Sequence, residues 1–185
     1  MNTTSFKLIP FAAEMQGELA LYSLHGQLSM AENTLQITFQ LEGELAKLRI
    51  AHSSGPPLRQ DLLWQATCLE FFLAAAGNSD YWEYNLSPAG HWNVYHLEGY
   101  RQGLAEEPAY KQLPFSVMGD DKQLSLSLTC ALPPALASHR AAEGIEVGVS
   151  AVLQSSSGEL AYWAVAHPGS EPDFHHRSGF CLKFA

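Results

Sequence analysis

Apolar and polar residues alternate along much of the chain with a period of two. Residues 35–41 read LQITFQL, and residues 124–129 read LSLSLT. Because successive side chains of a strand point to opposite faces, this alternation predicts half-buried antiparallel strands. Similar patterns predict further strands at Leu19–Leu24, Leu45–Ile50, Thr67–Ala75, Tyr81–Leu86, Trp92–Leu97, Phe115–Met118, Ile145–Leu153, Leu160–Ala166 and Phe180–Phe184.

Turn-forming residues separate the predicted strands. Gly, Pro, Ser, Asn and Asp gather at 54–57, 77–80, 87–90, 119–121 and 155–158, and residues 30–34 fit a hairpin turn. A short helix is predicted over 133–142, because two prolines open this segment and Gly144 follows it. Many short strands with turns at this spacing predict a single all-β domain over residues 1–185. Its expected architecture is an antiparallel, jelly-roll-like β-sandwich with one short helix.

Composition and charge narrow the classes of partner. The chain has 185 residues, of which 46% are hydrophobic and 16% charged, and its formal net charge is -9. Its 10 Lys and Arg residues form no basic run. Because nucleic acids and anionic membrane surfaces attract clustered cations, we expect neither as a partner. The N-terminal residues contain no apolar run of signal-peptide length, so we expect a cytoplasmic protein.

Sequence signatures of metal and catalytic chemistry are absent. Cys68, Cys130 and Cys181 lie far apart without a CxxC pair, and we expect them to be reduced core thiols. There is no G-x-S-x-G, H-E-x-x-H, G-x-G-x-x-G or P-loop motif. These absences favour a binding protein over an enzyme, with no cofactor and no metal.

The segment 59–101 mixes aromatic residues with a few charges, and alternation divides its first strand. Leu69, Phe71 and Leu73 share a fully apolar face, which leaves Glu70 on the other face. A carboxylate among apolar neighbours is costly unless it is paired or hydrogen-bonded. Two interpretations stay open: a salt bridge from Glu70 to Arg59 or Arg101, or an acceptor for ligand hydroxyls.

The strand over 81–86 divides in the same way. Trp82, Tyr84 and Leu86 form an apolar face, and the other face carries Tyr81, Glu83 and Asn85. If this strand pairs with the one before it, the second face continues that of Glu70. Carboxylate and amide groups beside an aromatic ring suit a sugar, whose hydroxyls need polar partners and whose C–H face needs a flat apolar surface. An ordinary solvated sheet face is the alternative.

The last third of the chain supplies further candidate residues. Trp163 and His167 share one face of a predicted strand and are candidates for the site. The run 167–177 contains three histidines together with Asp173, and its spacing matches no standard set of metal ligands. A proline-containing loop at the mouth of a cleft, donating hydrogen bonds, fits this run better than a metal site.

The order of these residues resembles that of DOMON-like proteins, which are related to carbohydrate-binding module family 9. The resemblance rests on RQDLLW at 59–64, TCLEFF at 67–72, YWEYNLSPAGHW at 81–92, the pair at 100–101, WAVAHP at 163–168 and PDFH at 172–175. It implies an antiparallel β-sandwich with a ligand cleft on one sheet, where tryptophans sandwich a sugar ring. Trp64 and Glu70 match the stacking platform and the acceptor of that family. Trp163 and Phe174 are both candidates for the second platform.

Together these patterns predict a non-catalytic module for a small saccharide or similar polar ligand. The expected ligand-binding residues are Trp64, Glu70, Glu83, Asn85, Arg101, Trp163, His167, Asp173 and His175. Three alternatives stay open. The first is a haem- or metal-binding DOMON-type domain, which would use Met118 and histidines. The second is an enzyme, which would use Glu70 and Glu83 as paired carboxylates. The third is an interaction domain, which would bury its aromatic face against a protein partner, as in a homodimer.

Overall fold

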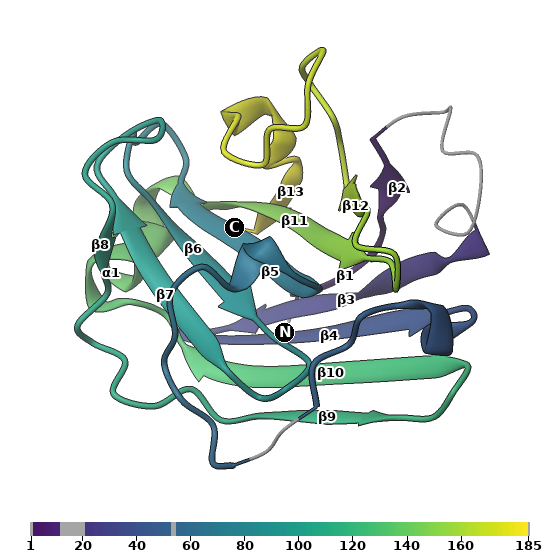
Figure 1. Cartoon of the computed structure of the whole chain (residues 1–185). Coiled ribbons are helices and arrows are strands. Elements are labelled where there is room, and N and C mark those ends of the chain that lie inside the picture. Colours follow the sequence, from purple (N-terminus) through teal and green to yellow (C-terminus); the bar gives the residue numbers. More distant parts are fainter. Residues whose placement is uncertain (1, 12–20, 53–54, 185) are drawn as a thin grey trace.

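Two antiparallel sheets form a β-sandwich in the computed structural model, which describes residues 2–11, 21–52 and 55–184 (Figure 1). The five-stranded sheet has the order β1 (Asn2–Lys7), β3 (Ser23–Ala31), β4 (Thr34–Glu42), β10 (Gln123–Ala131) and β9 (Phe115–Gly119). The eight-stranded sheet has the order β2 (Ile9–Pro10), β12 (Leu160–Ala164), β11 (Ile145–Gln154), β5 (Cys68–Ala75), β6 (Tyr81–Leu86), β7 (Trp92–Leu97) and β8 (Ala105–Glu106), and β13 (Leu182–Phe184) also pairs with β11.

The helical elements are short. They are α1 (Pro134–Glu143) and the 3-10 turns η2 (Leu45–Lys47), η3 (Leu63–Gln65) and η4 (Arg177–Gly179). The expected all-β sandwich with one short helix is thus confirmed. None of the helices in the described part of the chain is long and apolar enough to cross a membrane.

The core between the sheets follows the alternation of the sequence. Along β4 the residues Leu35, Ile37, Phe39 and Leu41 are buried, and the polar residues between them are exposed or half-buried. In the other sheet Phe71 stacks on Tyr84 with ring centroids 4.2 Å apart. Burial of such rings is the main favourable contribution to the stability of a sandwich of this kind.

The eight-stranded sheet is buried on both faces at its centre. Every residue of β5 and β6 is buried, including the polar ones. On the outer face a second apolar cluster contains Phe72, Tyr81, Tyr95 and Phe180. The segment between β12 and β13 covers this face, since Phe180 lies 5.5 Å from Phe72 between ring centroids. The outer face is therefore a second, smaller interior rather than a plain solvated surface.

Several sequence-based expectations about secondary structure need correction. The strand predicted at Leu45–Ile50 is wrong: Leu45–Lys47 is a 3-10 turn, and only Leu48 bridges a neighbouring chain segment. Leu45 and Leu48 are both buried, and their spacing of three matches the 3-10 period rather than a strand. The start of the predicted strand at 19–24 lies outside the described residues. The strand Asn2–Lys7 escaped prediction because only one of its side chains is buried.

The three cysteines are free, but they differ in burial. Cys68 is buried, Cys130 is half-buried and Cys181 is exposed. The expectation of three core thiols is therefore wrong for Cys181, which lies between η4 and β13 at the surface of the covering segment.

Candidate functional site

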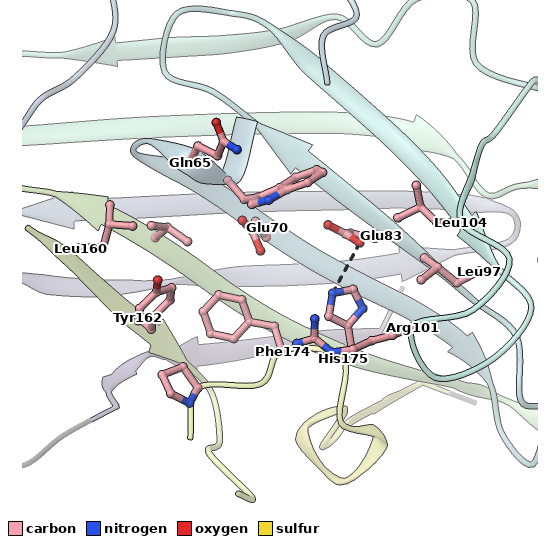
Figure 2. A pocket seen from close by; sticks show the side chains of 13 residues that line it. Gln65, Glu70, Glu83, Leu97, Arg101, Leu104, Leu160, Tyr162, Phe174 and His175 are labelled. Carbon is pink, nitrogen blue, oxygen red and sulfur yellow. Dashed lines mark ion pairs between the residues drawn. The ribbon is translucent and has the colours of Figure 1, made fainter. Parts of the chain in front are cut away.

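A cavity of about 450 Å³ opens on the outer face of the eight-stranded sheet. Figure 2 shows that its walls come from the sheet, from the turn η3, from the loop after β7 and from the segment after β12. The residues that line it are Trp64, Gln65, Glu70, Glu83, Leu97, Arg101, Leu104, Val152, Leu160, Tyr162, Pro172, Phe174 and His175. Five of the nine expected binding residues are among them: Trp64, Glu70, Glu83, Arg101 and His175.

The register of β5 with β6 places Glu70 and Glu83 close together. Glu70 pairs with Asn85, and Phe72 pairs with Glu83, so the two carboxyl groups are diagonal neighbours on one face of the sheet. This arrangement is the one that the sequence alternation predicted. Both side chains appear at the floor of the pocket in Figure 2.

Glu70 is 2% exposed, and its Oε1 atom has no hydrogen-bond partner among the described residues. The salt bridge considered for Glu70 is not formed, because Arg59 pairs with Glu106 at 3.2 Å and Arg101 pairs with Asp173 at 2.9 Å. Burial, and then the charge of Glu83, raise the pKa of Glu70 well above its ordinary value. Burial therefore favours the neutral, protonated form of the Glu70 carboxyl group.

Glu83 is held by one hydrogen bond and lies next to an imidazole. Its Oε1 accepts a hydrogen bond of 2.8 Å from Asn85 Nδ2, and its Oε2 lies 3.9 Å from His175 Nε2. Burial raises the pKa of Glu83 to about 7, against the opposing effects of Asn85 and Arg101. Burial also lowers the pKa of His175 to about 4. The imidazole is therefore neutral at pH 7, and its contact with Glu83 is not a charge pair there.

Asp173 fastens the segment after β12 to the loop after β7. It accepts hydrogen bonds from Tyr100 Oη at 2.7 Å, Arg101 Nη2 at 2.9 Å and the backbone N–H of His175 at 3.1 Å. Burial alone would raise the pKa of Asp173, but the hydrogen bonds from Tyr100 and Arg101 outweigh it and lower the pKa. Asp173 does not line the cavity that contains Glu70 and Glu83. It positions His175, whose Nδ1 lies 2.8 Å from Tyr81 Oη.

Aromatic rings form the sides of the pocket. Trp64, on the turn η3, meets Tyr95 edge to face at 5.9 Å between ring centroids. On the opposite side Tyr162 meets Phe174 edge to face at 6.1 Å. Trp64 and Phe174 are both half-buried, which leaves apolar ring surface open to the cavity. Phe174 was one of the two candidates for the second stacking platform.

The other candidate, Trp163, lies elsewhere. Trp163 is 3% exposed and belongs to the core between the two sheets. Trp163 therefore does not line this cavity, and alternation along β12 places its neighbour Tyr162 there instead. Because Trp163 and Tyr162 are both aromatic, the sequence pattern alone fitted either orientation of this strand.

Two further expected residues lie outside the cavity. His167 is at the surface, where its Nε2 lies 2.9 Å from the backbone oxygen of Ile9, and its ring packs against Phe11. His167 does not line the cavity that contains Glu70 and Glu83. Asn85 is fully buried and reaches the site only through its hydrogen bond to Glu83.

Sequence reasoning missed several lining residues, which are apolar or uncharged: Gln65, Leu97, Leu104, Val152, Leu160, Tyr162 and Pro172. They come from separate segments and carry no motif. Within residues 2–11, 21–52 and 55–184, no group of three or more His, Cys, Asp or Glu side chains is arranged to hold a metal ion.

Comparisons with known proteins find similar structures but no matching sequence. No protein-family model matches the chain, and no curated protein sequence matches it. A crystal structure of a proposed carbohydrate-binding protein from Bacteroides uniformis superposes with a TM-score of 0.61 at 12% identity, over 94% of this chain and 83% of that one. A family 9 carbohydrate-binding module from Caldicellulosiruptor kristjanssonii, solved with cellotriose, superposes with a TM-score of 0.51 at 11% identity, over 91% of this chain and 75% of that one. The chain thus has a fold like that of carbohydrate-binding module family 9, in agreement with the resemblance of its sequence.

Proposed function

We propose that the pocket on the outer face binds a small saccharide and does not transform it. The observation that carries this proposal is Glu70, a buried carboxyl group whose Oε1 has no partner among the described residues and which lines the cavity. A buried polar atom without a hydrogen bond is unfavourable. A ligand hydroxyl at this point would supply the missing bond.

The remainder of the pocket has the mixture of surfaces that a sugar ring needs. Trp64 and Phe174 offer aromatic faces for the C–H groups of the ring, and Glu83 and Arg101 offer polar groups for hydroxyls. A volume of about 450 Å³ is within the usual range for small-ligand sites. The cellotriose complex of the family 9 module supports the choice of ligand class.

Calorimetric titration tests the proposal with D-glucose, cellobiose and cellotriose as probes. We expect heat of binding for at least one of them, and we expect Trp64→Ala to weaken binding at least tenfold through loss of the stacking surface. Met118→Ala is the matched control, because Met118 is an exposed large apolar residue on the other sheet. The absence of heat with all three sugars, or equal weakening by both variants, would contradict the proposal.

A further inference from the structure

The floor of the pocket contains more acidic groups than the cations around it neutralise. Arg101 is the one arginine or lysine among the lining residues, and its guanidinium is hydrogen-bonded to Asp173 at 2.9 Å. His175, the other basic side chain there, is neutral near pH 7. Glu70 and Glu83 therefore share the pocket with a single guanidinium group, which already pairs with Asp173 although its charge also acts on Glu83.

The oxygen atoms of the two carboxyl groups are only partly used. Asn85 donates to Glu83 Oε1, and among the described residues nothing donates to Glu70 Oε1. The thiol of Cys68 and the hydroxyl of Ser150, which lies opposite Glu70 on β11, are both close enough to favour the ionised form of Glu70. Neither of them donates a hydrogen bond of acceptable geometry to Glu70 Oε1. Glu70 thus keeps a buried acceptor atom without a donor, in a side chain that is almost completely buried and lines the cavity.

We propose that the ligand is a saccharide with a protonated primary amine, and that Glu70 and Glu83 hold its ammonium group between them. This proposal rests on the proposed function, because it assumes that a saccharide occupies the pocket. An ammonium group has three N–H donors and no acceptor, so it complements two carboxylates better than a hydroxyl does. Charge-assisted hydrogen bonds of this kind are about twice as strong as neutral ones.

Binding of the ammonium group changes the protonation of the floor. Burial favours the protonated form of Glu70 and raises the pKa of Glu83 to about 7. A cation between them favours the ionised forms, so the protein releases protons as the amine binds. The other ionisable groups that surround the pair keep one charge state between about pH 5 and pH 8; they are Cys68, Tyr81, Tyr95, Arg101, Asp173 and His175.

Calorimetry with four related sugars tests the assignment on the whole chain. D-glucosamine carries an ammonium group on ring carbon C2, and 6-amino-6-deoxy-D-glucose carries one on the exocyclic carbon C6. D-glucose and N-acetyl-D-glucosamine carry none. At pH 7 we expect one of the amines to bind at least tenfold more tightly than both neutral sugars. Its apparent enthalpy should vary between buffers of different ionisation enthalpy, because protons are released.

Two variants test whether Glu70 is responsible for the tighter binding of the amine. Glu70→Gln keeps the shape of the side chain but cannot ionise when the amine binds, so the amine should bind this variant no more tightly than D-glucose does. Glu159→Gln, at an exposed position in the turn between β11 and β12, should change nothing. Thermal melting first establishes that Glu70→Gln folds; if it does not, the comparison of the four sugars on the unaltered chain decides.

The possible results separate the two proposals. Binding of D-glucose or N-acetyl-D-glucosamine as tightly as the amines would overturn the ammonium assignment and leave saccharide binding standing. Amine binding that survives Glu70→Gln unchanged would also overturn it. If none of the four sugars binds, the ammonium assignment fails, and saccharide binding fails with it only when cellobiose and cellotriose also give no heat.

Discussion

Arg101 donates a hydrogen bond of 2.9 Å to Asp173 across 72 positions of sequence, and this contact joins two loops that border the pocket. Arg101 itself has a positive φ of 53°, in the left-handed region that residues other than glycine seldom adopt. Its backbone N–H donates to Tyr81 Oη at 3.2 Å. The position of the segment that carries Phe174 and His175 therefore depends on a few polar contacts at the pocket rim.

Asp173→Ala should loosen this segment more than Arg101→Ala does. Asp173 accepts three hydrogen bonds, and its loss should lower the free energy of unfolding by about 1–3 kcal/mol. The side chain of Arg101 is 52% exposed, so solvent screening limits the loss from Arg101→Ala to about 1 kcal/mol or less. Urea denaturation measures both values, and hydrogen exchange should show faster exchange over residues 172–176. Arg49→Ala, at an exposed position, is the control; equal effects of Asp173→Ala and Arg49→Ala would refute the role of Asp173.

The two tryptophans once considered as a pair of platforms should behave in opposite ways. Trp163→Ala removes a buried indole from the core and should lower the free energy of unfolding by about 3–5 kcal/mol. Trp64→Ala removes a half-buried ring at the pocket wall and should lower stability far less, while it weakens sugar binding. Chemical denaturation of both variants checks this contrast. Similar stability losses for the two would mean that Trp163 does not lie in the core.

The contrast between these tryptophans also shows which side-chain orientations can be predicted from the sequence. Glu70 and Glu83 could be placed because each is the polar residue in an otherwise apolar or aromatic alternation, and a strand allows only two orientations. Along β12 the same reasoning failed, because Tyr162 and Trp163 are both aromatic and either could face the core. Phe174 and His175 reach the pocket through a long segment without periodicity, and its path depends on contacts such as Asp173 with Arg101. No local pattern encodes such contacts.

Stability should depend on pH through Glu83. Its pKa in the folded protein is about 7, above the ordinary 4.5, so the folded state binds more protons between these values. Protonated Glu83 can be buried without a charge. The contribution of Glu83 to the free energy of unfolding is therefore fully present below about pH 4.5, and it is lost as the pH rises through 7. Glu83→Gln should therefore be more stable than the unaltered chain at pH 8 by a margin on the order of 2–3 kcal/mol beyond their difference at pH 4.5. Denaturation of both proteins at the two pH values checks this; a constant difference would refute it.

His175 acts in the opposite direction. Its pKa of about 4 in the folded protein lies below the ordinary 6.5, so the folded state binds fewer protons between these values. The contribution of the neutral His175 imidazole to the free energy of unfolding is fully present above pH 6.5, and it is lost as the pH falls toward 4. We expect His175→Gln to unfold less readily on acidification than the unaltered chain, measured by denaturation at pH 6.5 and pH 4.5. A parallel loss of stability in both proteins would show that another group controls acid sensitivity.

Gly148 on β11 controls how closely the covering segment approaches the sheet. A Cβ atom at this position would lie 2.9 Å from Cδ1 of Phe180, a ring buried in the outer apolar cluster. Gly148→Ala should therefore displace Phe180 and lower the free energy of unfolding by about 1–3 kcal/mol, as overpacking does. Since the same segment carries Phe174, sugar binding should weaken as well. Gly99→Ala is the matched control, because a Cβ there meets no atom within 4 Å. Denaturation and sugar titration compare the two variants, and a Gly148→Ala protein with unaltered stability and binding would show that the covering segment does not need this close contact.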